Sequence, residues 1–196
     1  MTRLAAILVV ATAACTGDIA GGSGEPGGAD AGTTPAMHGE GAVARGALWV
    51  AAQVPYCQAP NHQRDYDTAC ASTCTRPDNA DWDPYRSDCS GFVSWAWQLP
   101  APGRTTAGFA PFQTDLTHEI PGDQLRPGDA VNNSDHVMLF AAWTQPGSEA
   151  RFMEETGCSS STPYAVEVTA AVTISGSTVT VQYHGTYTAI RYDDAP

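Results

Sequence analysis

Apolar positions in the first half of the folded region recur at the spacing of helices that are buried on one side. Residues 43–54 (VARGALWVAAQV) predict an amphipathic helix that ends before Pro55, because the residue before a proline disfavours helical backbone. A second helix is predicted from about Asp88 to Gln98, where Pro100 stops it. The residues of the first helix expected to face the core are Leu48, Trp49 and Ala52.

The last third of the chain instead carries short apolar runs separated by turn residues. Two of these runs alternate apolar and polar residues and meet at Gly176, which is typical of a β-hairpin. The strands expected in this region cover residues 136–143, 150–155, 172–175 and 178–182. Helices followed by antiparallel strands predict an α+β domain, in which N-terminal helices, one carrying a candidate nucleophile, pack on an antiparallel β-sheet.

The N-terminal residues predict export rather than structure. Residues 1–14 (MTRLAAILVVATAA) contain one arginine and a short apolar run that ends in small residues, which is the pattern of a signal peptide. Cys15 follows as in a bacterial lipoprotein box, so lipidation at Cys15 and simple signal cleavage are both open. Residues 16–41 are rich in glycine and proline and predict a disordered tether. The folded domain is then expected at 42–196, with a cysteine-rich loop at 57–86.

The net charge of the chain argues against one class of binding partner. Nine lysines and arginines against 21 aspartates and glutamates give a formal net charge of -12, and no basic patch is visible. Nucleic acid is therefore an unlikely partner, because it is bound through clustered basic residues. We expect a monomer that is exported and anchored to the cell envelope through a lipid, or otherwise secreted or periplasmic.

The six cysteines fit an oxidising compartment. If Cys15 carries a lipid and Cys89 is a nucleophile, four cysteines remain and can form two disulfides in three possible connectivities. The candidates are Cys57, Cys70, Cys74 and Cys158. A structural zinc site is an alternative that would leave Cys158 unpaired. Its ligands would be Cys57, His62, Cys70 and Cys74.

Cys89 lies where a helix start would activate a thiol. Asp88 can cap the second helix, so that Cys89 falls in the first turn, where unpaired backbone N–H groups and the helix dipole favour an anion. Gly91 would let another chain approach closely. The alternative for Cys89 is a small, buried apolar residue.

A nucleophilic thiol needs a base, and His136 is the best placed of the five histidines. It opens the apolar strand HVMLFAAW, where its ring can face a neighbouring helix while Val137, Leu139 and Ala141 point the other way. The next strand offers Glu154 and Glu155, whose side chains point to opposite faces, so one of them should share a face with His136 and orient it. The alternatives without a catalytic role are that His136 is an exposed histidine at a strand end and that the glutamate is a surface residue.

Three motifs in order then resemble one protein family. DCSGFV at 88–93, LRPGDAV at 125–131 and HVMLF at 136–140 resemble the NlpC-type cell-wall cysteine peptidases, a papain-like family related to the cysteine, histidine-dependent amidohydrolases. The segment VPY at 54–56 also resembles the family's tyrosine-bearing segment. The similarity covers roughly residues 43 to 157.

This resemblance implies a papain-like fold and a set of site residues. Cys89 would be the nucleophile, His136 the base and Glu154 the third polar residue. Tyr56, Asp88 and Ser90 would bind substrate, and the backbone N–H of Cys89 would contribute to an oxyanion hole. No cofactor and no metal are required by this chemistry.

The function expected from the sequence is hydrolysis of an amide bond, with peptidoglycan stem peptides as the substrate implied by the resemblance. A transamidase or acyltransferase would use the same residues, because an amine can intercept the acyl-enzyme in place of water. A catalytically idle module that binds a peptide or the cell wall is the alternative from another class.

Overall fold

The computed structural model describes residues 39–193. The expected signal peptide, Cys15 and the tether up to residue 38 lie outside the described residues. The helices are α1 (Glu40–Ala52) and α2 (Cys89–Ala96), with short 3-10 helices η1 (Thr106–Gly108) and η2 (Gly122–Gln124). The strands are β1 (Thr117–Glu119), β2 (Ala130–Asn132), β3 (Val137–Gln145), β4 (Glu149–Glu155), β5 (Ala165–Ser175), β6 (Thr178–Val181) and β7 (Gly185–Tyr192).

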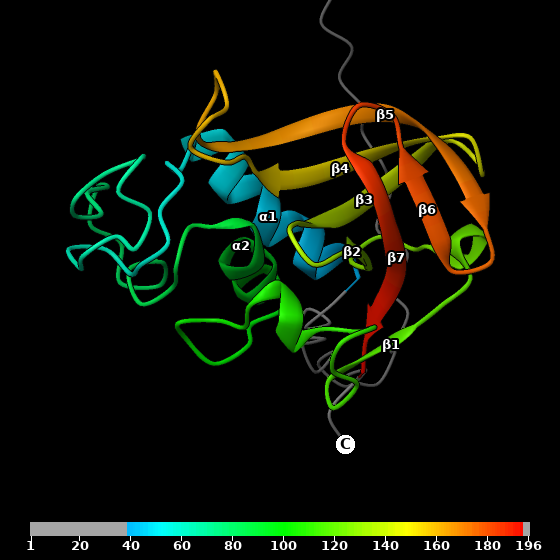
Figure 1. The fold of residues 1–196 in the computed structure, drawn as a ribbon, viewed down its shortest axis with the longest axis horizontal. Helices are drawn as coiled ribbons and strands as arrows, with labels where there is room; N and C mark the ends of the chain where they lie inside the picture. Colours follow the sequence, from blue (N-terminus) through cyan, green and yellow to red (C-terminus); the bar gives the residue numbers. More distant parts are fainter. Residues whose placement is uncertain (1–38, 194–196) are drawn as a thin grey trace, which may run out of the picture. The chain divides into compact units, whose positions relative to one another are not determined.

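The strands form an antiparallel sheet that closes on itself. The order is β7-β2-β3-β4-β5-β6, and β6 pairs again with β7 to close a six-stranded barrel (Figure 1). Thr188 of β7 shows the closure directly, because it pairs with Asn132 of β2 on one edge and with Thr178 of β6 on the other. The short strand β1 pairs with the far end of β7.

This architecture contradicts the predicted fold class. The described residues form a mostly β structure with two short α-helices, not an α+β papain-like domain with N-terminal helices on a sheet. The prediction failed because it did not include β7 or the first half of β5. Closure of the barrel depends on pairings between residues far apart in sequence, which local periodicity does not report.

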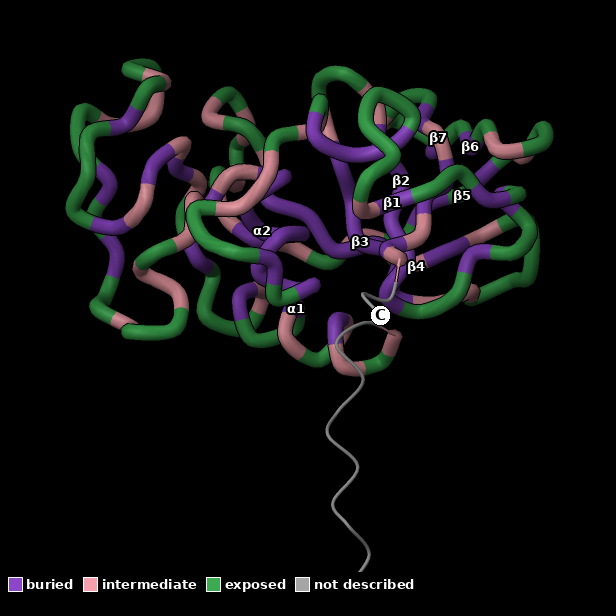
Figure 2. The backbone as a smooth tube through the Cα atoms, turned by 90° about the horizontal axis from the view of Figure 1, so that it is seen from below, coloured by how far each residue is buried: buried purple, intermediate pink, exposed green. Residues whose placement is uncertain are grey.

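Two apolar layers hold the fold together. One fills the barrel and includes Met138 and Phe140 of β3 and Phe152 of β4. The other lies between the helices and the outside of the barrel, and it includes Leu139 and Met153 together with α1 and α2. The first five residues of β3 are therefore buried on both faces, which explains the apolar run that begins this strand (Figure 2).

The helices differ from the prediction in their bounds and in one face. Helix α1 begins at Glu40, within the expected tether, and ends at Ala52. Trp49 is buried as expected, but Leu48 is 53% exposed and Ala52 is also exposed, so those two assignments were wrong. The buried stripe follows a spacing of four and three residues, which is one face of a helix. It consists of Ala42, Gly46 and Trp49.

Candidate active site

Cys89 is the first residue of α2. Asp88 caps the helix, and its Oδ1 accepts a hydrogen bond of 2.6 Å from the backbone N–H of Gly91. Among residues 39–193, Cys89 is the one cysteine outside a disulfide, and it is buried within the layer between helices and barrel. The helix start thus presents a free thiol in the turn where backbone N–H groups favour a negative charge.

Gly91 allows a close approach of the protein's own backbone, not of a second chain. A Cβ built on this residue would lie 2.1 Å from the carbonyl oxygen of Arg86. The segment before the helix therefore folds back onto α2 at a distance that only glycine allows. The space that the sequence suggested for a second chain is occupied by residue 86.

His136 is held at the end of the turn between β2 and β3. Its backbone N–H donates to Oδ1 of Asn133 at 2.8 Å, and the N–H of Asp135 donates to the same oxygen at 2.9 Å. The orientation expected for the flanking strand was reversed, because Val137, Leu139 and Ala141 pack with the helices. The His136 ring nevertheless lies close enough to Cys89 of α2 for the two side chains to interact electrostatically.

Glu154 of β4 lies against the imidazole of His136. In the register of the two strands Leu139 pairs with Met153, so His136 and Glu154 become diagonal neighbours on one face. The distance between Nε2 of His136 and Oε2 of Glu154 is 2.5 Å, and the Glu154 side chain is buried. A carboxylate only accepts hydrogen bonds, so Nε2 donates and Nδ1 is the nitrogen left for the thiol.

The electrostatics of the three residues favour a charged imidazole. Burial lowers the pKa of His136, but hydrogen bonds with Cys89 and Glu154, together with their negative charges, outweigh burial and raise it to about 10. His136 therefore carries a proton at neutral pH, between a thiol and a carboxylate. This is the arrangement in which an imidazolium stabilises a thiolate and can later give up its proton.

The neighbouring Glu155 is on the opposite face and does not contact His136. Its side chain is 0% exposed, and neither carboxylate oxygen has a hydrogen-bond partner. Burial, followed by the negative charge of Asp88, raises its pKa well above the usual value, although Arg76 acts in the opposite direction. Burial thus favours the neutral form of Glu155, while Glu154 takes the position that orients the base.

The three expected substrate-binding residues all lie near Cys89, but two of them are engaged within the protein. Asp88 accepts from Gly91 and from the hydroxyl of Ser90, whose Oγ is 3.1 Å from Oδ1. Arg86 also lies against Asp88, with Nε 3.1 Å from Oδ2. Ser90 is buried, so these side chains fix the start of α2.

Tyr56 is the member of the set with a partly open side chain. Its hydroxyl accepts a hydrogen bond of 3.0 Å from Nε2 of Gln58. Burial raises the pKa of Tyr56 to about 12, and the charges of Asp88 and Cys89 act in the same direction. The phenol therefore stays protonated beside the nucleophile and can donate a hydrogen bond to a substrate.

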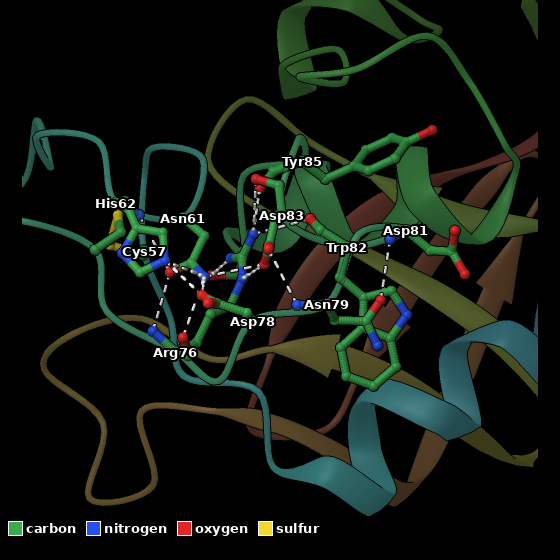
Figure 3. A network of polar contacts seen from close by, with 12 residues as sticks. Cys57, Asn61, His62, Arg76, Asp78, Asn79, Asp81, Trp82, Asp83 and Tyr85 are labelled. Carbon is green, nitrogen blue, oxygen red and sulfur yellow. Dashed lines mark hydrogen bonds and ion pairs between the residues drawn. A yellow bond between two sulfur atoms is a disulfide. The ribbon is translucent and has the colours of Figure 1, made fainter.

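The cysteine-rich loop is built around a buried amide and a buried guanidinium. Asn61 accepts from the backbone N–H of Arg76 at 3.0 Å and donates to Oδ1 of Asp83 at 3.0 Å (Figure 3). Arg76 in turn donates to the hydroxyl of Ser87 at 2.8 Å and to the carbonyl of Tyr85 at 2.7 Å. These bonds connect the loop to the residues just before Cys89.

The four candidate cysteines form two disulfides, Cys57–Cys74 and Cys70–Cys158. The zinc alternative is therefore wrong, since its three sulfurs are oxidised in pairs. Asp65 lies close to Cys57 and Cys74, but these sulfurs are bonded to each other. The disulfides are compatible with an extracellular protein.

Removal of the Cys70–Cys158 disulfide should destabilise the protein more than its half-buried position suggests. The bond joins residues 88 positions apart, and a chain-entropy relation then gives a loss of about 4–5 kcal/mol in the free energy of unfolding. For Cys57–Cys74, with a separation of 17, the same relation gives about 3 kcal/mol before any loss of packing.

Denaturation by guanidinium chloride of the two double alanine variants measures both effects. A loss below about 1 kcal/mol in Cys70→Ala/Cys158→Ala would show that the loop and the segment after β4 stay together without the bond.

Sequence reasoning missed two side chains of this region, His184 and Tyr187. His184 lies in the turn between β6 and β7, and Nδ1 is 3.4 Å from Oε1 of Glu154. The ring of Tyr187 meets that of His136 edge to face, with centroids 6.4 Å apart. No local signal could have found them, because β7 reaches the site only through closure of the barrel.

No protein-family model matches the chain, and no curated protein or solved structure shows significant similarity to it. Within the described range, no helix is both long enough and apolar enough to span a membrane.

Proposed function

We propose that the protein is an exported cysteine hydrolase that cleaves an amide bond through Cys89, His136 and Glu154. The observation that carries the proposal is the placement of the His136 imidazole beside the free thiol of Cys89, with Nε2 2.5 Å from the buried carboxylate of Glu154. A binding module has no need for a nucleophile, a base and an orienting carboxylate in one chain of contacts. Such a chain is the arrangement used for nucleophilic catalysis.

The reaction would proceed in two steps. The Cys89 thiolate attacks the amide carbonyl carbon, and the oxyanion is stabilised by backbone N–H groups at the start of α2, including that of Cys89. The C–N bond then breaks as the His136 imidazolium protonates the leaving amine. A water molecule, deprotonated by the now neutral imidazole, attacks the thioester and releases the acid and the thiol.

The substrate class rests on the motif resemblance and on the pocket beside Tyr56. DCSG at 88–91, PGD at 127–129 and His136 in this order support a cell-wall peptide substrate. A pocket of about 190 Å³ lies between the cysteine-rich loop and Pro163, with Tyr56 and Ser87 in its wall. The pocket has room for one side chain of a peptide, and its wall includes Ser87, two residues before Cys89. We therefore propose peptidoglycan stem peptides as substrate.

Export accounts for the two disulfides and for the signal-like residues 1–14, and a lipid on Cys15 would keep the enzyme at the cell envelope. Mass spectrometry of the protein purified from membranes distinguishes a lipidated Cys15 from simple cleavage.

Alkylation of Cys89 by iodoacetamide tests the proposed pair, with both disulfides kept oxidised. At pH 6 we expect the wild type to react about 10- to 100-fold faster than His136→Ala, because the imidazolium maintains a thiolate that the variant lacks. The two rates should converge towards pH 9, where an ordinary thiol ionises by itself.

His62→Ala is the matched control, since His62 pairs with Asp78 in the cysteine-rich loop, outside the proposed triad. It should retain the wild-type rate at each pH. Equal rates for wild type and His136→Ala at pH 6 would refute the proposed catalytic pair, and a binding role would then be the better explanation.

A further inference from the structure

Glu154 has an imidazole on each of its two carboxylate oxygens. Oε2 lies 2.5 Å from Nε2 of His136, and Oε1 lies 3.4 Å from Nδ1 of His184. The side chain of Glu154 is 5% exposed, so water cannot easily replace either neighbour. Since a carboxylate accepts and does not donate, the contact with His184 is favourable only when Nδ1 carries a proton.

The turn that carries His184 is tied to the ring of His136 by Tyr187. The hydroxyl of Tyr187 donates to the backbone carbonyl of His184 at 2.8 Å, while its ring packs edge to face against His136. The charge of Glu154 also raises the pKa of Tyr187, in addition to the larger effect of burial. One tyrosine of β7 thus holds the backbone of one histidine and the ring of the other.

A second connection runs through Asn133. Its Oδ1 accepts from the backbone N–H of His136, and its Nδ2 donates to the backbone carbonyl of Thr186 at 3.0 Å. The turn that carries His136 and the hairpin that carries His184 are therefore joined through the side chain of Asn133. Together with Tyr187, this bond places the two histidines on either side of Glu154.

We propose that His184 is a positioning residue for the catalytic site, acting through Glu154. Its imidazole faces Oε1 through Nδ1 and so restricts rotation of the carboxylate, which keeps Oε2 on Nε2 of His136. The proposal rests on the proposed function, because it assigns His184 a role in orienting that base. The other charged or titratable groups that act on this carboxylate come from α2, β4 and β7, and they are Cys89, Glu155 and Tyr187.

The test uses the alkylation rate of Cys89 at pH 6 in the full-length protein. His184→Ala should slow the reaction about 5- to 10-fold, because a freely rotating carboxylate maintains the imidazolium less well. His184→Asn should stay within about 2-fold of the wild type, since its Nδ2 donates from nearly the same place as Nδ1. The bond from Tyr187 goes to the backbone of residue 184 and is available in both variants.

His118→Ala is the matched control, because His118 pairs with Asp193 through Nδ1 at a distance from the proposed triad. It removes the same kind of imidazole–carboxylate contact and should leave the rate unchanged. Thermal unfolding of all variants shows whether a slow variant is merely less stable.

A double variant decides whether His184 acts through Glu154. In a Glu154→Gln background, His184→Ala should change the rate by less than about 2-fold, since the group that it positions is already gone. An equal effect in both backgrounds, an Asn variant as slow as the Ala variant, or no effect of His184→Ala would each overturn the proposal. If His136→Ala slows alkylation and His184→Ala does not, only this inference fails; if neither does, the proposed function fails as well.

Discussion

Replacing Glu154 by glutamine is expected to lower the rate of amide hydrolysis by about 100-fold or more, whereas Glu155→Gln should retain it within about 3-fold. The two residues are neighbours in sequence and differ only in the face of β4 that they occupy. Oε2 of Glu154 accepts a hydrogen bond from the N–H group at Nε2 of His136, over a distance of 2.5 Å. A glutamine there can turn its NH₂ towards Nε2 and favour the wrong tautomer of the base.

Glu155→Gln is the matched control because burial favours the neutral form of Glu155. Its pKa is raised well above the usual value, and a protonated carboxyl and an amide have nearly the same shape and charge. The substitution should therefore change little at neutral pH. The measurement is the release of new amino groups from purified peptidoglycan fragments, with Cys89→Ser as the inactive reference.

If both variants lost activity to the same extent, the distinction between the two faces of β4 would be wrong. If the fragments were joined to an added amine instead of hydrolysed, mass spectrometry of the products would identify a transamidase on the same triad.

Gly91→Ala is expected to destabilise the protein by at least about 3 kcal/mol. The added Cβ would lie 2.1 Å from the backbone oxygen and 2.7 Å from the backbone carbon of Arg86, and a backbone cannot move aside as a side chain can. Arg86 is also fixed by its guanidinium, which donates to the carbonyl of Arg104 at 2.6 Å. Relief of the clash would displace the start of α2, where Cys89 lies.

Gly46→Ala in α1 is the control for the intrinsic preference of helices for alanine. Its Cβ would lie 3.1 Å from the ends of three side chains, those of Phe92, Leu139 and Met153, which can shift by a few tenths of an ångström. Because alanine is favoured over glycine by about 1 kcal/mol inside a helix, this variant should stay within about 1 kcal/mol of the wild type. Urea denaturation measures both variants, and equal stabilities would contradict the close approach at Arg86.

Local sequence patterns predicted the structure correctly where residues a few positions apart are enough to determine it. Asp88 followed by CSG predicted a helix start, and Asp88 does cap α2 through Gly91. The apolar run after His136 predicted β3, and ARFMEE predicted β4. The alternation of side chains along a strand also predicted that only one of Glu154 and Glu155 would face His136.

Other features could not be predicted from local patterns. The inward face of α1 was assigned wrongly at Leu48 and Ala52, because several small apolar residues in that helix permit more than one buried stripe. The side chains of β3 were assigned to the wrong sides because both faces of that strand are buried, so alternation in polarity is absent. The pairing among the cysteines was also left open, because the spacing of cysteines along the chain does not show which loops lie together in the fold.

The sequence by itself determined the residue types and local positions on which the proposed chemistry depends: a cysteine in the first turn of a helix, a histidine opening a strand, and a pair of glutamates on the next strand. Only the tertiary structure decided that the strands close into a barrel, that Cys70 pairs with Cys158, and that His184 reaches Glu154. Helix capping and strand alternation are set by residues a few positions apart. Closure of β7 onto β2 and β6 instead joins residues as many as 60 positions apart, such as Ala130 and Ile190, and depends on the packing of the whole core.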